Sequence, residues 1–186
     1  MVVDIGGGTT EIAVISLGGI VYAESVKVGG DKMDTDIAMY IRRNHSLLIG
    51  ESSAEKIKKE LGNALITKKD ANKTMKIKGR HLTSGIPVEI SISEEDISSA
   101  LKDTTDAIIN GVLTALEKTP PELSADIVEK GIMLTGGGGN LRNFDEVLRK
   151  KTGPPVVVSD HALGCVALGA GKCLEEMKVL RNVLIS

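Results

Sequence analysis

Tryptophan is absent from this chain of 186 residues, and aromatic residues make up only 2% of it. A hydrophobic core must therefore be built from aliphatic side chains, chiefly valine, isoleucine, leucine, alanine and methionine. The scarcity of aromatic residues also argues against a nucleic-acid partner, because single-stranded bases are usually held by stacking on aromatic rings. The formal net charge is −2, so the chain has no basic surplus of the kind that binds nucleic acid.

Cysteine and long hydrophobic runs are scarce too. The two cysteines, Cys165 and Cys173, are too far apart for a CxxC pair, and nothing indicates a disulfide framework, so we expect a reducing, cytoplasmic setting. No apolar run approaches the roughly 18 residues that predict a membrane span. The N-terminus shows no charged region followed by an apolar stretch, so we expect no signal peptide. The histidines, His45, His81 and His161, are widely spaced and form no metal-ligand pattern.

Glycine, in contrast, is abundant, and its first run lies almost at the start of the chain. The apolar run Met1–Ile5 is interrupted by Gly6–Gly8, and the β-branched stretch at 9–17 predicts a second strand. After a turn, residues 20–28 predict a third strand, which makes a meander of hairpins. In a dinucleotide-binding fold or a P-loop the glycine run leads into a helix. Here it leads into another strand, which disfavours both of those interpretations.

Hydrophobic periodicity and turn residues predict the remaining elements. In chain order these are a helix at 31–45 with Asp31 as its cap, a helix at 52–65 capped by Ser52 or Ser53, a strand pair at 75–93, a helix at 93–119 ended by Pro120–Pro121, a strand at 130–135, a helix capped by Asn140 and ended by Gly153, a strand at 156–159, and a helix at 160–177 with buried thiols. The chain length suits one ordinary domain or two small lobes. The lysine-rich segment 56–80 is either a site for acidic lipid or nucleic acid or, as we favour, a solvated face.

Each of two glycine runs follows an apolar strand, and these two runs contain the candidate binding residues. The backbone N–H groups of Gly6–Thr10 can bind a phosphate, and the threonine hydroxyls can add donors. Asp4, just before the run, is an oxygen ligand for Mg²⁺, directly or through water. The second run, Gly136–Gly139, offers a flat backbone surface for a nucleoside. Both runs can also be plain tight turns, but two of them in this order, with an acid before the first, favour a nucleotide site.

Several motifs resemble those of a known superfamily. The stretch "DIGGGTTEIAVIS" resembles the second phosphate motif of the ATPase superfamily of actin, sugar kinases and heat-shock chaperones, and "GIMLTGGGGNLRNFDEVL" resembles its adenosine motif. The stretches "SLGGIV", "LLIGE", "EKTPPELSADI" and "ALGCVALGAGKCLE" are similar to the bacterial actin homologues that determine rod shape, the MreB family. The resemblance covers essentially the whole chain.

This resemblance implies an α/β fold. Family members begin with another half, which carries the first phosphate loop and a catalytic glutamate, and this chain resembles the second large lobe only. The expected architecture is an actin-like ATPase lobe, a ribonuclease-H-like mixed sheet with flanking helices, plus a small inserted α+β subdomain. Residues 1–30 and 94–186 would form the lower subdomain, and residues 31–93 the inserted one.

The resemblance also implies a site for ATP and Mg²⁺, with a role for each matching residue. Asp4 would hold the water shell of the Mg²⁺, Gly6, Gly7, Gly8, Thr9 and Thr10 the β- and γ-phosphates, Gly30 and Asp31 would lie near the ribose, Glu55, Lys58 and Lys59 would flank ribose and adenine, and Gly136, Gly137 and Gly138 would back the adenosine. No catalytic residue is expected in this chain, where Asp4, Thr9 and Thr10 only support the reaction.

The function implied is half of an ATP-binding, filament-forming cytoskeletal protein that maintains rod shape by guiding side-wall synthesis. Its partners would be further copies of itself, the cell-wall elongation machinery and membrane-anchored shape proteins, with the inner membrane face reached only through the other half. The whole protein would be a slow cytoplasmic ATPase, and this chain alone inactive. The alternative is a lobe of a heat-shock chaperone or sugar kinase, although no substrate-binding acid of a kinase and no following peptide-binding domain is evident.

Overall fold

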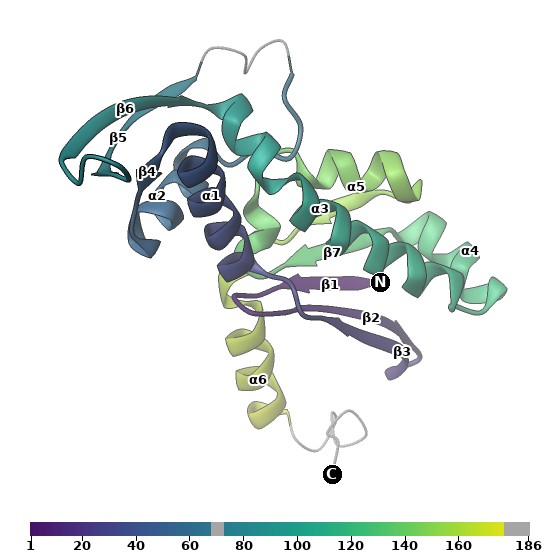
Figure 1. Ribbon diagram of the computed structural model, residues 1–186. Coiled ribbons are helices and arrows are strands. Elements are labelled where there is room, and N and C mark those ends of the chain that lie inside the picture. Colours follow the sequence, from purple (N-terminus) through teal and green to yellow (C-terminus); the bar gives the residue numbers. More distant parts are fainter. Residues whose placement is uncertain (68–72, 177–186) are drawn as a thin grey trace.

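The computed structural model describes residues 1–67 and 73–176, which form two sheets with helices packed around them (Figure 1). The larger sheet has the spatial order β3 (Gly19–Val26), β2 (Thr10–Ser16), β1 (Val2–Ile5), β7 (Ile132–Thr135) and β8 (Val156–Val158). The first three strands are the expected antiparallel meander, whereas β7 and β8 run parallel to β1. The carboxyl ends of β1 and β7 therefore lie at the same edge of the sheet.

The smaller sheet lies within the segment between β3 and the helix α3 (Glu94–Glu117). It has the order β4 (Leu47–Leu48), β5 (Thr74–His81) and β6 (Pro87–Ser93), all antiparallel, and it packs beside α1 (Gly30–His45) and α2 (Glu51–Leu61). The division into a lower and an inserted subdomain remains a prediction about this arrangement. In the lysine-rich segment, the charged side chains of β5 are exposed, while Lys68 and Lys69 lie outside the described residues.

The remaining helices follow the smaller sheet along the chain. They are α3 (Glu94–Glu117), α4 (Pro121–Lys130), the 3₁₀ turn η1 (Gly137–Asn140), α5 (Phe144–Thr152), the 3₁₀ turn η2 (Ala162–Gly164) and α6 (Cys165–Glu175). Helix α3 begins with a capping box in which the Ser93 hydroxyl accepts from the Asp96 amide and the Asp96 carboxylate accepts from the Ser93 amide. It contacts α1, α2 and β6 near its start and β2 and β3 further on, so it joins the two sheets (Figure 1).

The core is aliphatic, as the composition predicts. One continuous cluster of buried side chains runs from the larger sheet through α1, α2 and α3, and Phe144 is the one aromatic ring that is fully buried in the described part of the chain. Because the cluster is continuous, the helices α1, α2 and α3 and the larger sheet share one packed core.

Two expected helix starts are wrong, and backbone contacts explain both. Helix α1 starts at Gly30 and lacks a side-chain cap, since the amides of Gly30 and Asp31 donate to the carbonyls of Gly6 and Gly7, each at 2.9 Å. Asp31 is thus in the first turn instead of capping it. Helix α2 starts at Glu51 after Gly50, not at a serine cap, and it ends at Leu61 because the chain then turns to pair with Arg142.

Three further expectations differ from the structure. Helix α4 was not predicted: proline is tolerated at the first position of a helix, so Pro120–Pro121 ends α3 and also starts α4. Asn140 closes η1 and does not cap α5, which begins after Asn143, a residue in the left-handed conformation. The last helix begins at Cys165 because η2 precedes it, and its expected final residue, Met177, lies outside the described residues.

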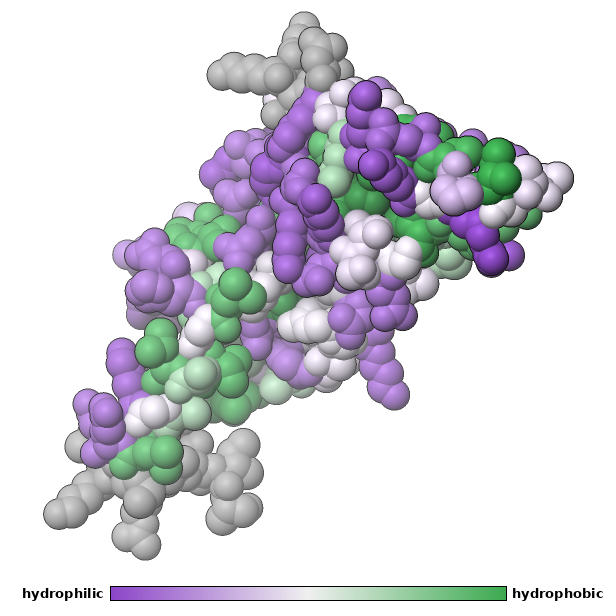
Figure 2. All heavy atoms as spheres, turned by 90° about the vertical axis from the view of Figure 1, so that its left-hand side faces the viewer, coloured by the Kyte–Doolittle hydropathy of each residue, from purple (hydrophilic) through white to green (hydrophobic). Residues whose placement is uncertain are grey.

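Helix α6 projects away from the rest of the molecule (Figure 1), and Figure 2 shows hydrophobic residues gathered at that lower end. None of its residues is buried, so the expected burial of the thiols is wrong and both cysteines are half-exposed. Leu163, Val166 and Leu174 are all more than half exposed. No helix in the described part of the chain has the length and apolarity needed to cross a membrane.

Candidate functional site

The two glycine turns lie side by side although about 130 residues separate them along the chain. Strand β1 pairs with β7 so that Asp4 is directly opposite Thr135, and the Thr135 hydroxyl donates to Oδ1 of Asp4 at 3.1 Å. The turn after β1 and the turn after β7 therefore meet at one edge of the sheet. In parallel sheets this edge, beyond the carboxyl ends of the strands, is where ligands usually bind.

The first turn has its carbonyl groups turned toward the protein. The carbonyl oxygens of Gly6 and Gly7 accept from the first amides of α1, and the Gly6 amide donates to the Thr9 carbonyl at 2.9 Å. Gly29 permits this approach, since a Cβ there would come within 2.7 Å of the Gly6 oxygen. The amides of Gly7, Gly8 and Thr9 donate no hydrogen bond within residues 1–67 and 73–176. A run of free amides of this kind is a binding site for an anion.

The two threonines after the glycines differ in their exposure to solvent. Thr9 is exposed, whereas Thr10 is fully buried and its hydroxyl donates to the Val28 carbonyl at 2.7 Å. The expectation that both hydroxyls are free donors for a phosphate is therefore wrong for Thr10, because the first residue of β2 turns its side chain inward. Asp4 is half-buried between the two turns, and a Cβ on Gly136 would come within 2.5 Å of its Oδ1.

The second turn rests directly on β1. Gly136 adopts a φ of 77°, which favours glycine, and a Cβ on Gly138 would overlap the side chain of Ile5. The backbone of η1 can therefore lie flat against the end of β1, with Gly137 exposed and Gly138 half-buried. Side chains at these positions would push the second turn away from the first.

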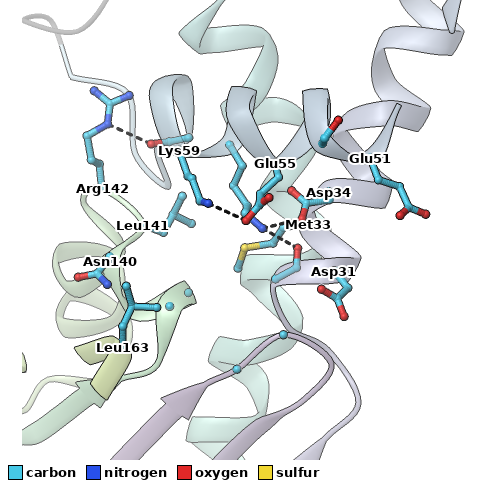
Figure 3. A pocket seen from close by; sticks show the side chains of 18 residues that line it. Asp31, Met33, Asp34, Glu51, Glu55, Lys59, Asn140, Leu141, Arg142 and Leu163 are labelled. Carbon is cyan, nitrogen blue, oxygen red and sulfur yellow. Dashed lines mark hydrogen bonds and ion pairs between the residues drawn. The ribbon is translucent and has the colours of Figure 1, made fainter. Parts of the chain in front are cut away.

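A cavity of about 830 Å³ opens between the two glycine turns and the helices α1 and α2 (Figure 3). Its lining consists of Gly6, Gly7, Gly30, Asp31, Met33, Asp34, Glu51, Ser52, Glu55, Lys58, Lys59, Gly62, Gly137, Gly138, Asn140, Leu141, Arg142 and Leu163. Its volume lies within the range of about 300–1,000 Å³ that small-molecule sites occupy. Of the residues predicted for the site, Asp4, Gly8, Thr9, Thr10 and Gly136 lie outside this lining, and the other nine belong to it.

Charge is distributed unevenly around the cavity. Nζ of Lys58 donates to the Gly30 carbonyl at 2.9 Å and to Oδ2 of Asp34 at 2.8 Å, so it ties α2 to the first turn of α1. Burial raises the pKa of the Asp34 carboxyl, against the opposing effect of Lys58. Lys59 pairs with Glu55 at 2.6 Å and thereby lowers the pKa of Glu55. These charges lie on α1 and α2, and Arg142 adds one after the second glycine turn, whereas the glycines themselves face the cavity with backbone groups alone.

Sequence reasoning missed about half of the lining. Asp34 could have been found, since it lies one helical turn after Asp31, and Asn140–Arg142 directly follow the second glycine run. Gly29 does not line the cavity but packs against the first glycine turn, and it was detectable as the first member of a glycine pair. Leu163 carries no local signal, because it reaches the cavity only through the position of η2.

A metal ion at this site would have few protein ligands. In residues 1–67 and 73–176 no group of three or more histidine, cysteine, aspartate or glutamate side chains could hold one. Mg²⁺ does not require such a cage, since it usually keeps several waters and binds through one or two carboxylates together with substrate phosphates. Asp4, with Oδ1 held by Thr135, fits that mode of binding.

A family profile described as "MreB/Mbl protein" matches residues 1–182. The chain belongs to the MreB/Mbl family. Among curated members, it is 50% identical over 175 residues to the cell shape-determining protein MreB of Escherichia coli strain K12, covering 94% of this chain and 50% of that protein. It is 43% identical over 180 residues to the cell shape-determining protein Mbl of Bacillus subtilis, covering 97% of this chain and 54% of that protein.

The fold of the chain also matches solved MreB structures. The crystal structure of MreB5 of Spiroplasma citri bound to ADP matches with a TM-score of 0.90 and 38% identity, covering 98% of this chain and 54% of that one. The expected actin-like fold is therefore confirmed, and the comparisons support the MreB interpretation rather than the chaperone or kinase alternative. The chain spans about half the length of the MreB and Mbl relatives it matches.

Proposed function

We propose that this chain is the second lobe of an ATP-binding, filament-forming MreB/Mbl protein that maintains rod shape by guiding side-wall synthesis. The observation that carries the proposal is that one cavity is bounded both by the two glycine turns and by the face of α2 that bears Glu55, Lys58 and Lys59. The printed function of the Escherichia coli and Bacillus subtilis relatives, shape determination, supports the cellular role. The ADP in the Spiroplasma citri structure supports a nucleotide ligand.

The chemistry of the walls suits the parts of ATP differently. Phosphates carry negative charge and fit the free amides of Gly7, Gly8 and Thr9. Sugar hydroxyls are donors and fit carboxylates such as Asp31. The base then lies between α2 and the flat backbone of Gly137 and Gly138.

The proposed roles follow that orientation. Asp4 holds Mg²⁺ through water, Gly6, Gly7, Gly8 and Thr9 with the main chain of Thr10 bind the β- and γ-phosphates, Gly30 and Asp31 lie near the ribose, Glu55, Lys58 and Lys59 flank ribose and adenine, and Gly136, Gly137 and Gly138 back the adenosine. Mg²⁺ held there would neutralise the charge that develops on the phosphates during hydrolysis. The group that aligns the attacking water belongs to the other half of the protein in this proposal, as do the contacts to the membrane.

The same proposal covers partners and location. Filaments would form by repetition of a head-to-tail contact between copies, in which each half contributes part of the interface. The cell-wall elongation machinery and its membrane-anchored shape proteins would be further partners, and the protein would act in the cytoplasm at the inner membrane face.

A titration of the ¹⁵N-labelled chain with Mg-ATP, followed by nuclear magnetic resonance, tests the proposal. We expect amide shifts confined to residues 6–10, 30–34, 55–62 and 136–142. Asp4→Ala should weaken Mg-ATP binding about tenfold while leaving binding of ATP in the presence of EDTA unchanged, because Asp4 acts only on the metal's water shell. Glu89→Ala, which removes an exposed carboxylate of β6, is the matched control. Absence of binding at millimolar ATP, or shifts away from the cavity, would contradict the proposal.

A further inference from the structure

A charged carboxylate is buried behind the cavity. Glu94, the first residue of α3, is only 2% exposed. Its Oε1 pairs with Nη2 of Arg142 and accepts a hydrogen bond from Nδ2 of Asn63 at 3.2 Å. Its Oε2 is also buried and has no partner among the residues that the structure describes. Burial of an ionised carboxylate is strongly unfavourable unless it is paired, so the contact with Arg142 is needed to keep Glu94 in place.

Arg142 links this carboxylate to the end of α2. Its Nε donates to the Gly62 carbonyl at 3.1 Å and its Nη2 to the Glu60 carbonyl at 3.3 Å. Its own carbonyl accepts from the Ala64 amide at 2.8 Å, so the main chains also run side by side here. The planar guanidinium therefore binds the Gly62 carbonyl through Nε, and the Glu60 carbonyl and Glu94 through Nη2, an arrangement that lysine could not reproduce.

Two asparagines complete the link. Asn63 is fully buried, and its Oδ1 accepts from the Leu65 amide at 3.1 Å and from Nδ2 of Asn143 at 2.9 Å. Nδ2 of Asn143 also donates to the Leu65 carbonyl at 3.0 Å. The segment after α2 is thus fastened to the segment after η1 by side chains from both.

These two segments continue into opposite walls of the cavity. Glu55, Lys59 and Gly62 line it from α2, whereas Leu141 and Arg142 line it from the chain that follows η1 (Figure 3). A Cβ on Gly62 would come within 3.0 Å of Cδ1 of Leu141, so the walls are already in close contact where they meet. Glu94 does not line the cavity, and its effect on a ligand must pass through Arg142 and Asn63.

We propose that Glu94 is a positioning residue, which sets the separation of the two walls that enclose the base of a bound nucleotide. The inference rests on the proposed function, because it takes the space between α2 and η1 as the base site. Loss of the carboxylate lets Arg142 and Asn63 shift and the walls separate, so contacts to the base weaken. The phosphate site on the first glycine turn is built from other residues and keeps its affinity.

The test compares Mg-ATP with Mg-tripolyphosphate, which has the phosphates but no nucleoside, by nuclear magnetic resonance titration of the full chain. Glu94→Ala should weaken Mg-ATP binding about tenfold and change Mg-tripolyphosphate binding less than twofold. Glu94→Gln keeps the acceptor for Arg142 and Asn63 and should recover affinity to within about threefold of the wild-type chain. Asp36→Ala is the matched control, because Asp36 is a buried carboxylate that bonds Lys32 and Thr104 away from these walls.

The following results would contradict the positioning role of Glu94. Equal losses for both ligands in Glu94→Ala, or a loss of ATP affinity no larger than in Asp36→Ala, would overturn the positioning role while leaving ATP binding intact. A wild-type chain that binds tripolyphosphate but not ATP would overturn both this inference and the proposed function. If Glu94→Ala does not fold, Asn143→Gly serves, since glycine keeps the left-handed φ of 59° and removes only the amide. It should weaken ATP alone about threefold, and an unchanged ATP affinity would refute the proposal.

Discussion

Replacement of Lys58 by methionine removes one ammonium group and keeps the length of the side chain. In the native protein this group lies 2.8 Å from Oδ2 of Asp34 and 2.9 Å from the Gly30 carbonyl. The side chains of Lys58 and Asp34 are 18% and 16% exposed, and Oδ1 of Asp34 is buried without a partner in the described part of the chain. The substitution therefore leaves a mostly buried carboxylate without its counter-charge.

The expected loss follows from that burial. Removal of one partner of a fully buried ion pair costs about 3–5 kcal/mol. Because this pair retains some contact with water, we expect Lys58→Met to lower the free energy of unfolding by about 2–3 kcal/mol at pH 7. The loss of stability should be smaller at low pH, because a protonated Asp34 carries no charge that needs Lys58 as its partner. The pKa of Asp34 is raised in the folded state, so the folded state holds the proton more tightly, and stability falls as pH rises from the unfolded value of about 3.9 through the folded one.

Urea denaturation followed by far-ultraviolet circular dichroism measures this loss, since the chain has no tryptophan to report by fluorescence. Lys59→Met is the control, because Lys59 and its partner Glu55 are 68% and 50% exposed, and we expect no measurable change. The double variant Asp34→Asn/Lys58→Met should recover most of the stability, since it removes the unpaired charge. The reasoning fails if Lys58→Met loses no more than Lys59→Met, or if the double variant is as unstable as the single one.

Three further predictions concern other parts of the structure. Gly29→Ala should cost about 1–3 kcal/mol in urea denaturation and weaken ATP binding, because its Cβ would press on the Gly6 and Gly7 carbonyls, whereas Gly50→Ala, with open space around it, should be neutral; equal effects would refute the contact. Burial alone would raise the pKa of Asp96, but hydrogen bonds from Ser93 and Tyr40 lower it overall, so its stabilisation is present above about pH 3.9 and is lost as pH falls through the lower folded value. Asp96→Asn should therefore cost about 1 kcal/mol at pH 7 and progressively less as pH falls below about 3.9 in thermal unfolding, and a constant loss across pH would contradict this. The chain alone should release no phosphate above background and form no pellet on sedimentation with Mg-ATP, because a clamp and a head-to-tail contact each need both halves; ATP-dependent pelleting would contradict the half-protein interpretation.

Local features of this chain were readable from the sequence because their causes lie within a few residues. Alternating β-branched residues interrupted by glycine predicted the meander of β1, β2 and β3. The acidic start of α3 and the glycine after α5 marked real helix ends. The aliphatic composition predicted the kind of core that formed. The two glycine runs also identified the backbone half of the candidate site.

Tertiary structure alone decided how these parts meet. The start of α1 is set by the carbonyls of Gly6 and Gly7, which no local pattern in the helix could reveal. The inward turn of the Thr10 hydroxyl depends on the position of Val28, and the pairing of Glu94 with Arg142 joins residues 48 apart in the chain. Such contacts depend on loop closure and on the parallel pairing of β1 with β7, and their free energy is shared among distant segments, so it leaves no periodic or local trace in the sequence.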